Sequence, residues 1–161
     1  MLRSDAEAYL VSRLGKSLIR VGKDGTTKTG ANLDLAQPIS YTLCLMGFPV
    51  VSLTVPADAD LASLAAGQFA EFYSRATSAT LEALVGWCDE VDEKGGTQSQ
   101  ALSQFAKQLQ MQLDTLDARI LRRWGDNPNP VIFGTMTEGT DLGAGGLSPL
   151  IPPPDPLHPL G

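Results

Sequence analysis

Residues 99–124 read SQALSQFAKQLQMQLDTLDARILRRW. Their apolar side chains recur every three or four positions, which places them on one stripe of an α-helix; the stripe consists of Leu102, Phe105, Leu109, Leu113, Leu116, Ile120 and Trp124. At ~1.5 Å per residue the helix would be roughly 38 Å long. Ser99 or Thr97 can cap its start, and Gly125 stands where a left-handed residue ends a helix. Because such a helix is unstable alone in water, another part of the chain or a partner must cover the stripe.

The composition fits one ordinary domain. The chain has 161 residues, of which 43% are hydrophobic, and its net charge is −6. That charge argues against general nucleic-acid binding, which needs a basic surface. No apolar run approaches the ~18 residues of a membrane span, and Asp5 and Glu7 interrupt any apolar signal core at the start. We expect a soluble protein that is made and kept inside a cell.

The charge is unevenly distributed along the chain. Residues 126–161 carry four acidic residues and no Lys or Arg, so they hold −4 of the total of −6 and leave −2 for residues 1–125. A basic segment near the N-terminus is opposed by Asp24 alone; it consists of Arg13, Lys16, Arg20, Lys23 and Lys28. Two hypotheses remain open: the opposite charges support head-to-side contacts between copies, or both are solvated surfaces.

Three helices are expected before the long one. A capping box at Ser4–Glu7 predicts a short helix that ends at Gly15 and turns Tyr9, Leu10 and Leu14 inward. A second helix should begin near Asn32 or Asp34 and run to Met46, with Gly47 as its stop. Its buried face would comprise Leu35, Ile39, Leu43 and Met46.

The connections are less regular. Residues 17–28 contain the turn signal Asp24-Gly25 and form either a small hairpin or, as we favour, a loop. Residues 48–56 should be extended because Pro49 and Pro56 disfavour helix in the residues before them.

A third, long helix should open at Asp58 or Asp60 and continue to the break at Gly95-Gly96. Its inward face would include Leu61, Leu64, Ala65, Phe72, Tyr73, Ala76, Thr80, Ala83, Leu84 and Trp87. A short polar connection joins it to the helix at residues 99–124, so an antiparallel hairpin is expected. The predicted fold is therefore all-α, a four-helix bundle-like domain over residues 1–125 dominated by this hairpin.

Residues 126–161 differ from the rest. They hold eight of the eleven prolines, a density that excludes helix and favours polyproline conformation. One interpretation is a disordered tail. Apolar residues nevertheless recur along it, and because the segment cannot build its own core, we expect an extended docking arm pinned to a neighbouring subunit or another protein. Its expected interface residues are Val131, Ile132, Phe133, Met136, Leu147, Leu150, Ile151 and Leu157.

The residues that carry chemistry are sparse. The single histidine, His158, lies in the proline-rich end, far from any expected scaffold helix. Cys44 and Cys88 lie among apolar residues and are expected to be reduced thiols, with a disulfide as the alternative. No metal-ligand spacing is present, and the acidic run at residues 89–93 is read as a solvated helix end. We expect neither an enzyme nor a cofactor or metal site.

Several stretches have a familiar layout: AEAYL at 6–10, VSLTVPADADL at 51–61, QFAEFY at 68–73 and GGTQSQALSQF at 95–105. With the second helix, which closes on Leu-Met-Gly, they resemble the small head–tail connector (adaptor, or head-completion) proteins of tailed bacteriophages, over about residues 2–125. The chain departs from that pattern in its long proline-rich end.

The resemblance implies a helical adaptor that forms a ring, typically of twelve copies, beneath the portal protein. Such a ring extends the DNA channel without sequence-specific binding and offers a platform to the tail or a second neck protein. It would be located in the virion neck after assembly in the host cytoplasm, and the family has no catalytic residues. Two alternatives remain: a bacterial helical interaction module or regulator with a proline-rich partner-binding tail, and an enzyme with a cofactor site between helices.

Overall fold

The computed structural model describes residues 1–50, 55–95 and 99–125, and within residues 91–100 the backbone of the helices alone. This part of the chain is helical throughout its regular structure and contains no strand. The elements are α1 (Arg3–Arg20), α2 (Leu33–Leu45), α3 (Asp58–Ala62), the 3₁₀ turn η1 (Ala66–Gln68), α4 (Phe69–Gly95) and α5 (Ser99–Trp124). The all-α prediction is confirmed for these residues, whereas the expected arm at 126–161 lies outside them.

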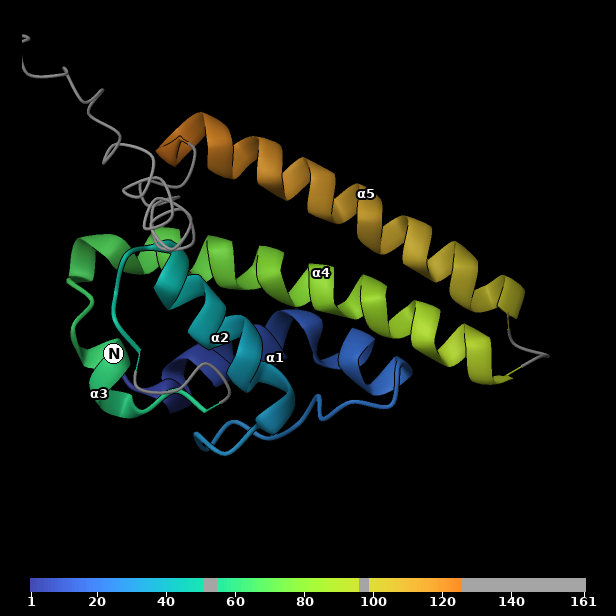
Figure 1. The fold of residues 1–161 in the computed structure, drawn as a ribbon, viewed down its shortest axis with the longest axis horizontal. Coiled ribbons are helices and arrows are strands. Elements are labelled where there is room, and N and C mark those ends of the chain that lie inside the picture. Colours follow the sequence, from blue (N-terminus) through green and yellow to red (C-terminus); the bar gives the residue numbers. More distant parts are fainter. Residues whose placement is uncertain (51–54, 96–98, 126–161) are drawn as a thin grey trace, which may run out of the picture. The chain divides into compact units, whose positions relative to one another are not determined.

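Helix α5 has the predicted bounds, and it pairs with α4 as an antiparallel hairpin (Figure 1). Gly125 ends it with φ +76°, and the Gly125 N–H donates to the Leu121 carbonyl oxygen (2.9 Å). Five residues of the apolar stripe are buried and two are half-buried; the buried ones are Leu102, Phe105, Leu109, Leu113 and Ile120. The stripe therefore finds its cover within the described chain.

In Figure 1, α4 runs between α5 on one side and α1 and α2 on the other. Both α1 and α2 pack mainly against α4 rather than against each other. The core is a mainly aliphatic cluster that also contains the rings of Phe72 and Phe105, and its fully buried members include Leu10, Leu18, Leu35, Ile39, Leu43, Leu61, Phe72, Leu84 and Leu109. No helix in the described ranges is long and apolar enough to cross a membrane.

The prediction that α1 ends at Gly15 is wrong. The helix continues to Arg20, and Gly22, with φ +76°, follows its end. Gly15 is needed for a different reason: its backbone is approached closely by the loop at Gly25. For residues 17–28 the hairpin alternative is also wrong, and the favoured loop is wrong for 17–20, which are helical, and confirmed for 21–28.

The predicted capping box is wrong as well. Leu2 precedes the first turn, and its N–H donates to the Asp5 carboxylate (2.8 Å). Helix α2, in contrast, begins as predicted: the Asn32 side chain accepts a hydrogen bond from the Leu35 N–H (3.2 Å), and Gly47 follows the helix end with φ +81°.

The long third helix is interrupted, which corrects the prediction of one continuous helix. Helix α3 stops at Ser63, and Ala65 has extended backbone (ψ 152°) before η1 and α4 begin. The start of α3 and the new start after the break each have one local bond: the Ala57 N–H donates to the Asp60 carboxylate (2.8 Å), and the Ala65 N–H donates to the Gln68 side-chain oxygen (2.9 Å). Each satisfies a donor at a new helical start, so Ala65 is exposed rather than inward.

Candidate interaction surface

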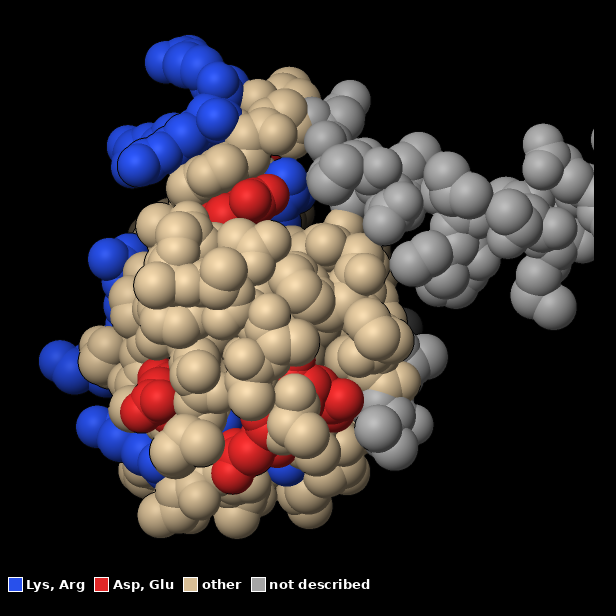
Figure 2. All heavy atoms as spheres, turned by 90° about the vertical axis from the view of Figure 1, so that its left-hand side faces the viewer, with Lys and Arg blue, Asp and Glu red and all other residues tan. Residues whose placement is uncertain are grey.

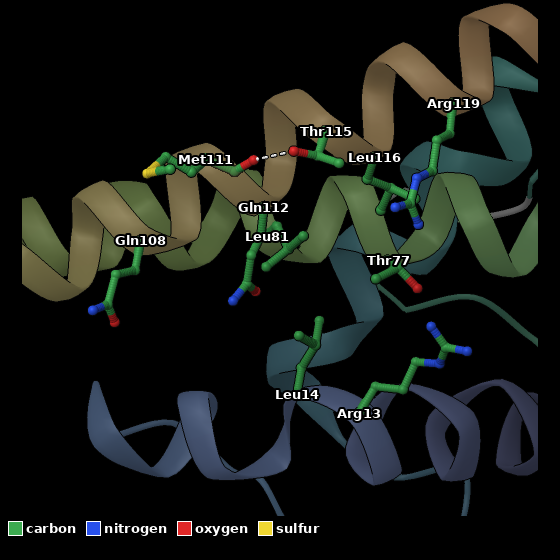
Figure 3. Close-up of a pocket in the computed structure, with 10 residues that line it drawn as sticks. All are labelled: Arg13, Leu14, Thr77, Leu81, Gln108, Met111, Gln112, Thr115, Leu116 and Arg119. Carbon is green, nitrogen blue, oxygen red and sulfur yellow. Dashed lines mark hydrogen bonds between the residues drawn. The ribbon is translucent and has the colours of Figure 1, made fainter.

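A groove of about 750 Å³ runs along the face of the hairpin that α1 covers incompletely (Figure 3). Helices α1 and α5 form its walls, and α4 forms its floor. The lining residues are Arg13 and Leu14 of α1, Thr77 and Leu81 of α4, and Gln108, Met111, Gln112, Thr115, Leu116 and Arg119 of α5. The groove is therefore assembled from three helices that are far apart in the sequence.

A contact between the end of α1 and the start of α5 closes one end of the groove. The Arg20 guanidinium lies over the Phe105 ring, 4.2 Å from its centroid, and donates to the Ala101 carbonyl oxygen (3.5 Å). Two turns earlier on α1, Leu14 points toward Gln112 of α5 across open space (Figure 3).

The floor and lower walls of the groove are apolar. Leu14 of α1 and Leu81 of α4 lie at its base and are 6% and 3% exposed, and the more accessible apolar surface comes from Met111 and Leu116 of α5. The hydroxyl of Thr77 donates to the Tyr73 carbonyl oxygen (2.7 Å) and that of Thr115 to the Met111 carbonyl oxygen (2.7 Å). Both hydroxyl donors are thus satisfied within their own helices, which suits this surface to an apolar or extended peptide occupant.

Two arginines lie at one end of the groove, on opposite walls. Arg13 and Arg119 point toward each other across the position of Thr77 (Figure 3). Arg13 packs over the Tyr9 ring, 4.9 Å from its centroid. Neither arginine forms a salt bridge with a described residue, and no carboxylate lies among the lining residues in the described ranges. This end of the groove therefore favours an acidic group.

Two large apolar side chains are exposed on α5. Met111 is 70% exposed at the groove wall, and Leu121 is 53% exposed one turn before the end of α5. Single exposed apolar residues are common on any protein surface. Here Met111 adjoins an apolar groove with arginines at its end, and Met and Arg are both enriched in protein–protein interfaces.

The predicted basic segment does not form a single patch. Arg13 lines the groove, and the side chains of Lys16 and Lys28 are exposed and so accessible to a partner. Arg20, however, bridges to α5, and the Lys23 ammonium lies 4.6 Å from the Trp87 ring centroid and 3.7 Å from an Asp34 carboxylate oxygen. These two side chains hold the loop and helices together. Figure 2 shows Lys and Arg side chains projecting along one side of the face it presents, with mainly uncharged surface beside them.

A buried ionic cluster, which the sequence analysis missed, lies at the start of α1. Glu7 is fully buried; its carboxylate accepts from Arg3 Nε (3.0 Å), the Gly30 N–H (2.7 Å) and the Asn32 N–H (3.0 Å). Arg3 also donates to the carbonyl oxygens of Asn32 (2.9 Å) and Pro56 (3.3 Å). These partners surround both charges, and the cluster ties α1 to the starts of α2 and α3.

Both cysteines are free thiols, so the disulfide alternative is wrong. Burial raises the pKa of the Cys44 thiol, with Asp60 adding to the effect, and burial together with Asp89 raises the pKa of the Cys88 thiol. A raised pKa keeps a thiol protonated and unreactive near neutral pH. These cysteines are part of the packing.

No group of three or more His, Cys, Asp or Glu side chains gathers within the described ranges. Asp89 and Glu90 are exposed. His158 and the eight expected interface residues of the arm, from Val131 to Leu157, lie outside the described residues.

Comparison with protein-family models, with curated proteins and with solved structures finds no match for this chain.

Proposed function

We propose that this chain is a ring-forming adaptor of a phage neck, which joins the portal protein to the tail and extends the DNA channel. Residues 1–125 would form its helical domain as a bundle of α1, α2, α4 and α5, and residues 126–161 its docking arm. The proposal is supported by the resemblance of residues 2–125 to head–tail connector proteins and by the all-helical character of the described residues.

The observation that carries the proposal is the groove between α1 and α5. Its lining consists of leucines, threonines, glutamines, a methionine and two arginines, with no Asp, Glu, His, Cys, Tyr or Lys among the described residues that line it. Acid–base or nucleophilic catalysis needs such a group. A groove with an apolar floor and cationic end is instead suited to hold a segment of another protein.

A closed ring needs two different, complementary patches on each subunit, because its contacts are heterologous. The groove with Arg13 and Arg119 supplies one patch of positive character. Residues 126–161, with a net charge of −4, supply a candidate for the second. The mild net charge of −2 on residues 1–125 also suits a channel wall along which DNA slides without specific binding.

The test is the mass of the purified full chain, measured by native mass spectrometry with and without the portal protein. We expect a closed ring or a stable ring–portal complex, visible by electron microscopy as a particle with a central channel. A chain that stays monomeric or dimeric under both conditions would contradict the adaptor role and favour the interaction-module alternative. A ring whose inner surface is densely lined by Lys and Arg would contradict the proposed sliding wall.

A further inference from the structure

We infer that the groove between α1 and α5 binds the proline-rich end of a neighbouring copy, with residues 147–157 as the segment that enters it. The identity of the donor, a second copy, rests on the proposed function. The complementarity between the groove and the segment rests on their charges, on the spacing of apolar and acidic residues along the segment, and on the conformational entropy of the segment.

Charge is the first argument. Arg13 and Arg119 face each other at one end of the groove without a carboxylate partner among the described residues. Residues 126–161 carry Asp126, Glu138, Asp141 and Asp155 and no Lys or Arg. A carboxylate between two guanidinium groups receives charge-assisted hydrogen bonds from both. The segment thus provides the charge that the groove end lacks.

Spacing is the second argument. Residues 147–157 read LSPLIPPPDPL, so Leu150 and Ile151 precede Asp155 by four or five positions. In polyproline conformation, at ~3.1 Å per residue, this is about 12–16 Å. On α5, Met111 and Arg119 are eight residues apart, or roughly 12 Å at ~1.5 Å per residue. Leu150 and Ile151 can therefore lie near the exposed Met111 side chain while Asp155 reaches the arginines.

Conformational entropy is the third argument. Four prolines at 152–154 and 156 restrict the backbone before binding. A segment that is already restricted loses less entropy when it is immobilised in a groove than a flexible one does. The same prolines have no N–H to donate, so they lose little in a groove whose floor offers aliphatic surface.

The experiment is site-specific photocrosslinking in the full chain. A benzophenone amino acid replaces Gln112, which lines the groove, and the protein is mixed with an isotopically heavy copy at a concentration where native mass measurement shows association. We expect crosslinked peptides that join position 112 of one copy to residues 147–157 of the other. The matched control places the same probe at Gln110, which is exposed on α5 but does not line the groove, and should give few such peptides.

Charge reversal tests the pairing. Arg119→Glu should lower the yield of that crosslink about two- to fivefold, the range expected for one partly exposed ion pair. Adding Asp155→Lys to the same chain should restore it, because the pair is then reversed. Arg122→Glu, an exposed change on the same helix outside the groove, should leave the yield unchanged.

The outcomes separate this inference from the proposed function. Rings or portal complexes without crosslinks from position 112 to residues 147–157 would overturn the groove assignment and leave the adaptor role intact. Crosslinks to 147–157 of the same copy alone would overturn the exchange between copies. Intermolecular crosslinks in a species that never closes into a ring would support the groove assignment and contradict the adaptor role.

Discussion

Gly15 of α1 and Gly25 of the following loop touch backbone to backbone. A Cβ atom on Gly15 would lie 2.5 Å from the Gly25 carbonyl oxygen, and one on Gly25 would lie 2.1 Å from the Gly15 carbonyl oxygen. Side chains never pack that closely against backbone, so glycine is required at both positions for reasons of space. The contact fixes the loop that carries Lys23 and Asp24 against α1.

Gly15→Ala should therefore destabilise the protein, even though alanine is the better helix former. We expect a loss of about 1–3 kcal/mol in the free energy of unfolding, as for other overpacked sites, measured by urea denaturation. The control is Gly86→Ala in α4, where a Cβ meets nothing within 4 Å; it should be neutral or stabilise by up to about 1 kcal/mol. Equal effects at both sites would contradict the close contact.

Glu7→Gln should be among the most damaging conservative changes. It removes the negative charge from a carboxylate that is fully buried against Arg3 and two backbone N–H groups. Leaving a buried charge unpaired costs about 3–5 kcal/mol. The matched control is Glu71→Gln. It changes another i, i+4 ion pair, in which the partly exposed Glu71 carboxylate lies 2.8 Å from Arg75 Nε.

We expect the Glu71 variant to lose less than the Glu7 variant, because the Glu71 side chain is 21% exposed whereas Glu7 is fully buried. Thermal unfolding of both variants, followed by circular dichroism, provides the comparison. A loss at Glu7 no larger than that at Glu71 would show that the buried cluster contributes little to stability.

Asp24 should make the loop at 21–32 sensitive to acid. Hydrogen bonds from the Thr27 hydroxyl and N–H and from the Thr26 N–H hold the pKa of this carboxyl well below its ordinary value of 3.8. A depressed pKa in the folded state gives stability that is complete above the ordinary value and is lost as the pH falls through the folded value.

The stability difference between the native chain and Asp24→Asn should therefore be constant near neutral pH and shrink as the pH falls below 3.8. The pH dependence of urea unfolding measures this difference, and NMR titration of the Asp24 carboxyl gives the pKa directly. An Asp24 titration at the ordinary value would contradict the hydrogen-bonded turn.

The two thiols should react slowly with iodoacetamide at pH 8. Burial raises the pKa of both, and Cys88 is only 2% exposed whereas Cys44 is half-buried. We expect Cys44 to be modified before Cys88 and both to react fast in urea, as followed by mass spectrometry of the intact protein. Faster modification of Cys88 in the native chain would contradict its place in the core.

Helix α5 and the start of α2 could be predicted because their signals are local. An apolar stripe at helical spacing, Gly125 after the last turn and Asn32 before the first each act within a few residues. The errors arose where one local signal has two meanings. A glycine can end a helix or allow a close contact, and Gly15 does the second. The periodicity near Ala65 does not reveal that the Ala65 N–H donates to the Gln68 side-chain oxygen and so begins a new turn.

The sequence by itself determined that the regular structure in the described part of residues 1–125 is helical and that its last two long helices pair as a hairpin, because apolar periodicity and a short connection leave little alternative. Only the tertiary structure decided that Arg13 and Arg119, 106 positions apart, face each other across a groove. Periodicity tells which face of a helix is covered but not how far each neighbour extends along it. The contact of Arg20 with Phe105 at one end and the gap at Leu14 result from how three helices pack together.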